Sequence, residues 1–215
     1  DHNVGIANSL LDEMGLKVGE EGKRLRPDGQ PFLLLLDVMT GIQSWVDTAE
    51  IVASNLKAVG IQADLKSESR ELFRMRTQTA AHDIALWPGD GGMECLLDPR
   101  WYFPYNSESL QAPLYAKWYQ TRGKQGDEPP DQIKELMKTY DQITVSPSEA
   151  KQKELFDRII KANEENLWVI GLVQQPPDYY VVAKSMYNVP DKDFQSWIYP
   201  NPGPIHPEQF SFTKP

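Results

Sequence analysis

Apolar residues in the first half of the chain follow two periodicities, one typical of strands and one typical of helices. Residues 32–36 are five consecutive large apolar residues, which predicts a strand covered on both faces, as in a parallel sheet. Residues 61–65 alternate between apolar and polar side chains and predict a second strand with one wetter face. Residues 84–87 are a third apolar run, followed by turn residues, and predict a short buried strand.

Two helices are predicted between these strands. The first keeps one apolar face over residues 45–59, and Ser44 followed by Asp47 resembles a capping box at its start. Ser69 is expected to cap the second helix, which extends to about Thr79. The side chains expected to point inward are those of Leu72 and Phe73. Those expected to point outward or toward a cleft are Arg70, Arg74 and Arg76. The order of elements predicts the α/β class, with a mostly parallel sheet, flanking helices and right-handed crossovers.

Helical spacing recurs on both sides of this region. It predicts a helix over residues 7–14 that Gly15 ends, followed by a loop or small hairpin at residues 17–31. Ser146, which precedes Pro147 and Glu149, is the expected N-cap of a later helix. Helices in the second half are expected at residues 114–119, 133–143 and from Pro147 to about Asn166.

The C-terminal segment has a different character. Residues 167–173 and 179–183 are two further strand candidates, separated by a Gln-Gln-Pro-Pro sequence. After Val189 the chain is rich in proline, so it cannot form a regular core element by itself. We therefore expect a lobe of residues 1–189 and a Pro-rich tail of residues 190–215.

Composition and charge remove several classes of function. The chain has 215 residues, 40% of them hydrophobic, which is enough for one sizeable core. The 31 acidic residues exceed the 22 basic ones, and no Lys/Arg cluster stands out, so neither nucleic acid nor an anionic membrane is an expected partner. No apolar run approaches the roughly 18 residues of a membrane span. The N-terminus has neither a signal-peptide pattern nor an initiator Met, which indicates a mature product or a piece of a longer chain.

A glycine-rich loop follows the third predicted strand. Trp87 and Pro88 end the apolar run, and residues 89–92 then read Gly-Asp-Gly-Gly. Glycines around one carboxylate let a backbone approach a ligand closely, although the same composition is common in turns. In parallel sheets ligands bind beyond the carboxyl ends of the strands, where this loop is expected to meet those at residues 37–42 and 67–69. The candidate ligand-binding residues are Thr40, Trp87, Gly89, Asp90, Gly91, Gly92, Trp101 and Tyr102.

Catalytic and metal-binding constellations are not recognisable in the sequence. The three histidines lack metal-ligand spacing, and the motifs of P-loops, dinucleotide sites and serine hydrolases are absent. Asp90, Glu94 and Asp98 are close enough to suggest a glycosidase, but a hydrolase pair normally comes from separate elements. The lone Cys95 excludes an internal disulfide and is expected to be a small buried apolar residue. We expect no catalytic residue, no metal and no cofactor.

Several segments taken together resemble a known family. They are ANSLLDEMGL, AEIVASNLKAVGIQADLKSES, HDIALWPGDGG and PPDYYVVAKSMYNV, in this order along the chain. The combination resembles the C-terminal part of the extracellular solute-binding proteins of the peptide, oligopeptide and nickel ABC importers, known as family 5. The resemblance implies the second lobe of a type II periplasmic-binding-protein fold. It also implies that residues 190–215 return toward the first lobe.

The function implied by this resemblance is reversible binding of a small solute between two lobes, for delivery to the subunits of an ABC permease. A peptide is the first expectation and an oligosaccharide the second. In peptide-binding members, an Asp at the position of Asp90 pairs with the ligand's α-ammonium group. Trp87, Trp101 and Tyr102 are expected either to face the ligand or to pack in the core. A monomer is implied, periplasmic or extracellular, with or without a lipid anchor.

Two other classes of protein remain open at this point. A carboxylate-based hydrolase needs a partner carboxylate at the cleft. A stand-alone protein-interaction domain would show a flat apolar patch and no crevice at the strand ends.

Overall fold

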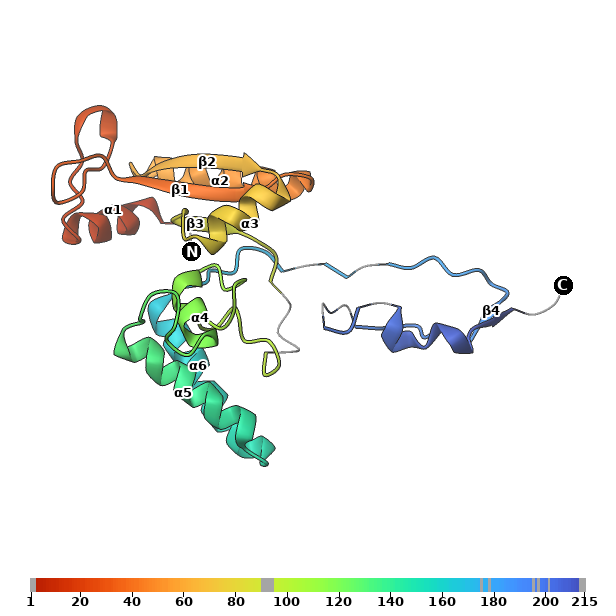
Figure 1. Cartoon of the computed structure of the whole chain (residues 1–215). Helices are drawn as coiled ribbons and strands as arrows, with labels where there is room; N and C mark the ends of the chain where they lie inside the picture. Colours follow the sequence, from red (N-terminus) through yellow and green to blue (C-terminus); the bar gives the residue numbers. More distant parts are fainter. Residues whose placement is uncertain are drawn as a thin grey trace. The chain divides into compact units, whose positions relative to one another are not determined.

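The computed structural model consists of two units (Figure 1). One contains Asp1–Trp87 and Arg100–Trp168, and the other contains Pro88–Pro99 and Val169–Pro215. The expected boundary between residues 1–189 and 190–215 stays a prediction. The structure describes residues 3–89, 95–174, 176–177, 179–194, 196, 198–200 and 202–212.

A three-stranded parallel sheet forms the centre of the first unit. Its strands are β1 (Leu33–Met39), β2 (Gln62–Glu68) and β3 (Ile84–Leu86), in the order β2-β1-β3. Leu36 and Val38 of the central strand β1 are fully buried, because a neighbouring strand lies on each side and a helix covers the face to which they point. The predicted α/β fold with a mostly parallel sheet is confirmed.

Helices cover both faces of this sheet (Figure 1). One face packs Leu36 and Val38 against Ala49 of the first covering helix. Asp37 lies between them in the strand and therefore points to the opposite face, where it meets Arg76 of the second helix. The two helices are α2 (Gln43–Ala58) and α3 (Arg70–Gln78).

Helix α3 begins where the sequence predicts. The Ser69 side chain accepts a hydrogen bond from the Leu72 amide at 3.3 Å and so caps the helix. Phe73 is buried as expected. Leu72 was expected to point inward, but its side chain is 40% exposed. The inward position one turn further along is taken by Arg76, which the charge of Asp37 draws toward the sheet.

Helix α2 does not begin at the predicted capping box. Its N-cap is Ile42, and Ser44 lies inside the first turn, where its carbonyl accepts a bond from the Thr48 hydroxyl. Gly41 has a φ of +101°, so the chain turns into the helix before Ser44 is reached. The Ser44 prediction is therefore wrong by two residues.

Arg24 holds the N-terminal segment against the end of α2. Its side chain is only 1% exposed. The Nε atom donates to the Val59 carbonyl at 2.8 Å, and the terminal nitrogens donate to Asp12 Oδ1 at 2.6 Å and Asn8 Oδ1 at 2.7 Å. The segment contains α1 (Val4–Glu13), ended near Gly15 as predicted, and a small hairpin with the 3-10 turn η1 (Glu20–Gly22). No residue of α1, all of which the structure describes, is fully buried, so these polar bonds contribute to anchoring it.

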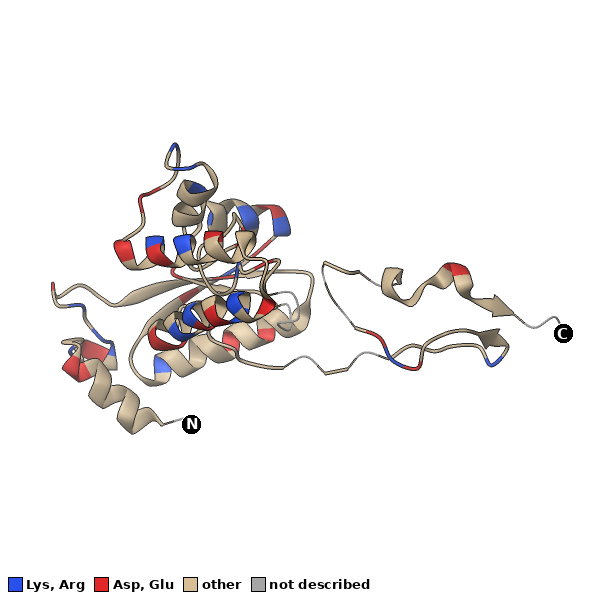
Figure 2. Cartoon of the chain, turned by 90° about the horizontal axis from the view of Figure 1, so that it is seen from below, with Lys and Arg blue, Asp and Glu red and all other residues tan. Residues whose placement is uncertain are grey.

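The rest of the first unit is helical. Ser146 is the C-cap of one helix, and Ser148 is the N-cap of the next, with its hydroxyl accepting from the Lys151 amide. The predicted cap at Ser146 is wrong because that residue still terminates the preceding helix. Figure 2 shows basic and acidic residues interspersed along these helices. The helices are α4 (Pro113–Gln120), α5 (Asp131–Val145) and α6 (Glu149–Asn166).

The second unit has little regular structure among its described residues. Strands β4 (Met186–Tyr187) and β5 (Ser211–Phe212) pair in antiparallel fashion, and η2 (Gly203–Ile205) and η3 (Pro207–Gln209) are single 3-10 turns. The strands predicted at residues 167–173 and 179–183 are not found in the described parts of those segments. Apolar composition alone does not make a strand, because a strand also needs a hydrogen-bonded neighbour.

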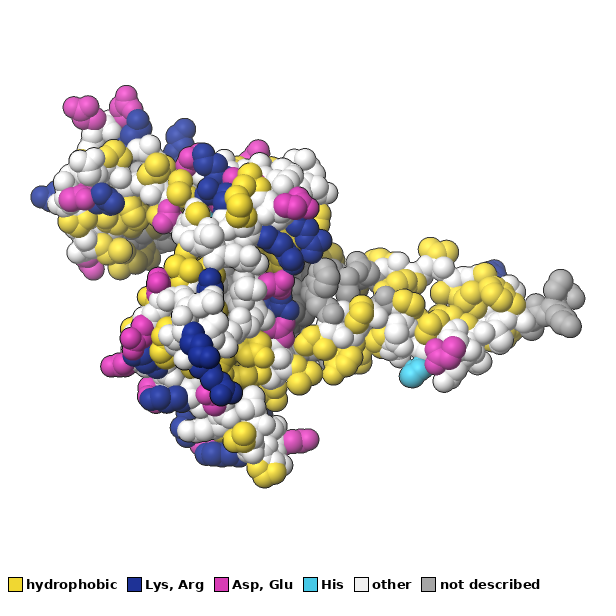
Figure 3. Space-filling model, in the orientation of Figure 1, with side chains coloured by type: hydrophobic (Ala, Val, Ile, Leu, Met, Phe, Trp, Pro, Cys, Tyr) yellow, Lys and Arg dark blue, Asp and Glu magenta, His cyan; other side chains and the backbone are white. Residues whose placement is uncertain are grey.

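Apolar side chains of the second unit are largely exposed, and Figure 3 shows them gathered along this segment. Tyr179 and Val181 are extreme cases, since both are almost fully exposed. Across the residues that the structure describes, no helix has the length and apolar character needed to cross a membrane.

The role of Arg24 predicts a large loss of stability on its replacement. We expect Arg24→Met to lower the free energy of unfolding of the chain by about 2–4 kcal/mol, because the buried Leu16 carbonyl and the part-buried acceptors at Asn8, Asp12 and Val59 lose their donor. Arg26→Met is the matched control, since Arg26 makes an exposed ion pair with Asp28 and should change stability by no more than about 1 kcal/mol. Urea unfolding measures both, and equal effects would contradict the anchoring role.

Candidate functional site

The carboxyl ends of the three strands lie at one edge of the sheet because all three run parallel. Thr40 joins two of these ends, since its amide and its hydroxyl both donate to the Glu68 carbonyl, at 2.7 and 2.9 Å. Asp37 and Ser67 were expected in the loops but lie within β1 and β2, so the loops begin at Thr40 and Ser69. The exposed Thr40 hydroxyl still has lone pairs that can accept a bond from a ligand.

Trp87 stands directly after β3 and is held between the two covering helices. Its ring stacks on Phe73 of α3 with 5.2 Å between centroids and 15° between planes. On the other side, Trp45 in the first turn of α2 lies at 5.4 Å and 59°. Trp87 remains half-buried against these two rings. It therefore places an indole with an accessible part at the sheet's carboxyl edge.

The glycine-rich loop is described only as far as Gly89, which is exposed. No atom of the described residues lies within 4 Å of a Cβ built there, so packing against those residues does not require glycine at this position. The predictions for Asp90, Gly91 and Gly92 lie outside the described residues. Cys95, expected to be buried, is half-buried.

Trp101 and Tyr102 make their contacts with α6. Asn163 of that helix donates to both of their carbonyls, at 3.1 and 3.0 Å. The Tyr102 ring meets the Phe156 ring edge-on at 5.2 Å. These bonds fix the loop after residue 100 on the helical part of the unit. A ligand-facing role for Trp101 and Tyr102 stays a prediction.

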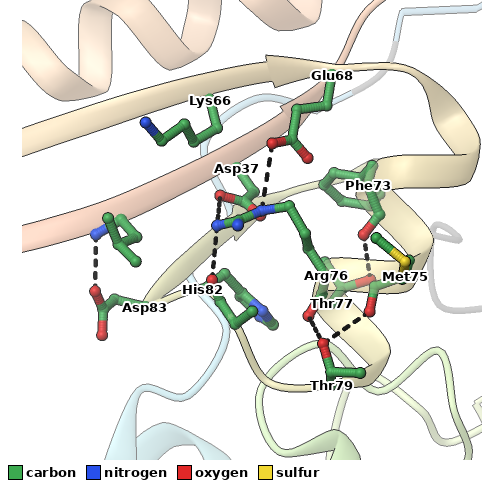
Figure 4. Close-up of polar contacts among 12 residues, drawn as sticks. Asp37, Lys66, Glu68, Phe73, Met75, Arg76, Thr77, Thr79, His82 and Asp83 are labelled. Atoms are coloured by element: carbon green, nitrogen blue, oxygen red, sulfur yellow. Dashed lines mark hydrogen bonds and ion pairs between the residues drawn. The ribbon is translucent and has the colours of Figure 1, made fainter.

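A buried charge cluster lies beneath the edge (Figure 4). Asp37 is completely buried, and Arg76 binds both of its carboxylate oxygens, at 2.7 and 3.1 Å. Arg76 also donates to the Ala81 carbonyl at 2.7 Å and lies 3.3 Å from Glu68 Oε1. The hydrogen bond that Arg76 donates to Asp37 is the main reason why the pKa of Arg76 is raised, so Arg76 stays protonated. Sequence reasoning missed this pair, although the carboxylate inside the apolar run of residues 33–39 was a visible signal.

A small hollow opens beside Trp87. Its volume is about 20 Å³, which is room for roughly one water molecule. Pockets that enclose a whole small-molecule ligand have volumes of about 300–1,000 Å³. The side chains that define it include Phe73, Arg74, Thr77, Trp87, Glu108 and Leu110.

The carboxylates near the edge are engaged in ion pairs, Glu108 with Arg74 and Arg100, and Asp37 with Arg76. Within the part of the chain that the structure describes, no three His, Cys, Asp or Glu side chains come together as a metal ion would need.

A parallel sheet between helices, with Trp87 at the end of one strand, defines the α/β class, in which ligands bind beyond the carboxyl ends of the strands. Residues 1–110 match the family model described as bacterial extracellular solute-binding proteins, family 5 middle. The chain therefore belongs to the family 5 extracellular solute-binding proteins. The resemblance inferred from its sequence segments is confirmed. No curated protein matches the sequence.

Solved structures of binding proteins share the fold. An oligopeptide-binding protein OppA is 30% identical, with a TM-score of 0.69 over 78% of this chain and 29% of its own. NikA from Brucella suis, in complex with Fe(III)-EDTA, is 25% identical, with a TM-score of 0.57 over 74% of this chain and 30% of its own. MelB from Agrobacterium fabrum, in complex with stachyose, has a TM-score of 0.64 at 16% identity, over 77% of this chain and 25% of its own. The chain thus spans 25% to 30% of the length of these structures.

The buried ion pair yields a double-mutant prediction. Arg76→Met alone should cost about 3–5 kcal/mol, because it leaves the Asp37 carboxylate buried and uncompensated. Asp37→Leu combined with Arg76→Met should recover much of that loss, because no isolated charge then remains in the interior. Denaturant unfolding of the two single variants and the double variant measures the coupling. A double variant whose loss equals the sum of the single losses would show that the two side chains do not depend on each other.

Proposed function

We propose that this chain is a lobe of the substrate-binding component of an ABC importer, from the C-terminal part of that protein. The lobe binds a small solute reversibly at the carboxyl edge of its sheet, and a second lobe closes over the solute from the other side. The observation that carries the proposal is the position of Trp87, half-buried between α2 and α3 and directly followed by the Gly89-Asp90 loop. Membership of a solute-binding family supports it.

A peptide is the proposed solute, and an oligosaccharide is the second candidate. The related structures support both, since one protein is named for oligopeptides and others hold a nonapeptide, mannohexaose or stachyose. Asp90 favours the peptide, because a carboxylate beside glycines suits the ammonium group of a peptide better than a neutral sugar hydroxyl. Gly89, Gly91 and Gly92 then allow the solute to approach the backbone, and Thr40, Trp101 and Tyr102 are further candidate contacts.

The small size of the hollow beside Trp87 supports a divided site. A hollow of about 20 Å³ cannot surround a peptide, so we propose that further contacts come from the partner lobe. Exposed apolar side chains support the same idea. Ile6 and Leu10 of α1 and Met14 at its C-cap are exposed, and Tyr179 and Val181 are exposed in the second unit. We propose that further parts of the protein cover these surfaces, and that residues 190–215 return toward the first lobe.

The whole protein is proposed to act without catalysis, as a monomer in the periplasm or outside the cell, and to pass its solute to the permease subunits. A carboxylate-based hydrolase is less well supported, because Glu108 and Asp37 are neutralised by arginines and are not poised as an acid and a base. A lipid anchor is compatible with this location.

Asp90 provides the direct test of the site. In the whole protein, Asp90→Asn should weaken the binding of a peptide by about 2–5 kcal/mol, the scale of breaking a desolvated charge pair, while the melting temperature stays nearly unchanged. Asp131→Asn is the control, because it removes the same charge from a fully exposed position on α5. Calorimetric titration with a trialanine probe and thermal unfolding of the same samples measure both effects. If Asp90→Asn binds trialanine as the wild type does, Asp90 only stabilises a turn.

The divided site makes a second prediction about this chain by itself. The 215-residue chain should fold but bind trialanine several kcal/mol more weakly than the whole protein, since the contacts of one lobe are missing. Calorimetry on the isolated chain measures this difference. Micromolar or tighter binding by the isolated chain would refute the divided site.

A further inference from the structure

Trp87 lies one residue beyond the strand that leads to it. The pairing of β3 with β1 ends at Leu86, so the ladder does not include Trp87. The next residue, Pro88, has no backbone N–H with which to extend the ladder. The sheet pairing therefore leaves the orientation of the indole to the side chains around it.

Two rings contact this indole, one from each helix that covers the sheet. Phe73 of α3 stacks on it, and Trp45 of α2 lies at 5.4 Å between ring centroids with 59° between the planes. Because α2 and α3 cover opposite faces of the sheet, the indole is contacted from both layers. An indole packed between two rings has fewer rotamers open to it than a free one.

The two contacting rings differ in what else they hold together. Phe73 is buried, so its replacement would also disturb the packing of α3 on the sheet. Trp45 is half-buried in the first turn of α2 and packs against the apolar core beneath that helix. It therefore connects the rigid interior to Trp87 and can be shortened with less damage to the fold.

We propose that Trp45 is a positioning residue for the solute site and that it acts through Trp87. The inference rests on the proposed function, in which Trp87 contacts the solute, and adds a residue that does not need to touch the solute itself. Trp45 keeps the indole in its binding orientation before the solute arrives. Such pre-organisation lowers the entropic cost of binding.

The rotamers of tryptophan set the size of this effect. The χ1 angle has three staggered wells and χ2 is roughly two-fold, so about six orientations are open to an unrestrained indole. The apparent dissociation constant rises by the inverse of the fraction of molecules in the binding-competent state. An indole released by the loss of Trp45 and competent for about one sixth to one third of the time thus weakens binding about 3- to 6-fold.

The test uses the whole protein, freed of bound solute by reversible unfolding, and a peptide mixture of di- to pentapeptides of Ala, Leu and Phe. Mass spectrometry identifies the peptide that the wild type retains most strongly, and calorimetric titration with this peptide gives the dissociation constants. Trp45→Ala should raise the dissociation constant about 3- to 6-fold. Trp45→Phe should bring it back to within about 2-fold of the wild-type value, because a ring again lies beside Trp87.

A double-mutant cycle separates positioning from a general loss of stability. In a Trp87→Ala background no indole remains to be positioned, so adding Trp45→Ala should change the dissociation constant by less than about 2-fold. Trp118→Ala is the matched control, since Trp118 is a half-buried tryptophan on α4 whose ring meets Lys134 at 5.9 Å, and it should leave binding unchanged.

Two results would show that Trp45 only supports the fold and would overturn the inference. One is an equal rise of the dissociation constant on Trp45→Ala with and without Trp87. The other is a loss of binding in Trp45→Ala that Trp45→Phe does not restore. Both leave the peptide-binding function standing.

The remaining outcomes distinguish this inference from the proposed function. Unchanged binding by Trp45→Ala, in a protein that retains peptides, overturns the positioning role alone. Unchanged binding by Trp87→Ala does the same, because Trp45 then has no solute contact to position. Failure of the wild type to retain any peptide of the mixture overturns the peptide as the proposed solute, and the positioning role with it.

Discussion

The buried pair between Asp37 and Arg76 is the constraint on which the arrangement of the lobe depends. A carboxylate in the middle of the central strand has no contact with water, so it requires a cation, and α3 is the element that supplies it. This requirement fixes the rotation of α3 against the sheet. Phe73 lies one turn before Arg76 and is thereby directed at Trp87, while Leu72 is turned to the solvent. A charge beneath the sheet thus decides which surface is presented at its carboxyl edge.

The carboxyl edge of the sheet has side chains fixed by contacts within the chain, but its hollow does not enclose a solute. Thr40 ties the ends of β1 and β2 together, and Trp87 is clamped by α2 and α3, so its groups are held in place without a ligand. Pre-organised groups of this kind lower the entropic cost of binding. The hollow beside Trp87 is nevertheless far too small to enclose a solute. A surface that is rigid yet open is what one half of a closing two-lobed site requires.

The parts of the fold that the sequence could predict are those set by neighbours in the chain. Residues 32–36, 61–65 and 84–87 carry their strand signal locally, and Ser69 caps α3 because the helix starts immediately after it. Interactions across long separations could not be inferred. Arg76 lies 39 residues from Asp37, and Arg74 lies 34 residues from Glu108, so no local pattern joins them. The strand predictions for residues 167–173 and 179–183 were wrong for the same reason, because a strand depends on a hydrogen-bonded neighbour elsewhere in the chain. Trp87 was expected to be the last residue of the third strand and lies directly after β3, and the aromatic rings that pack against it were not foreseen.

Hydrogen exchange of the whole protein, with and without the peptide mixture, tests the central claim that the solute binds at this edge. Exchange measured by mass spectrometry reports local opening of backbone amides segment by segment. The account predicts slower exchange on peptide binding at residues 87–92 and 107–111, with residues 24–31 unchanged. Slower exchange only in segments away from the carboxyl edge of the sheet, with residues 87–92 unaffected, would contradict it.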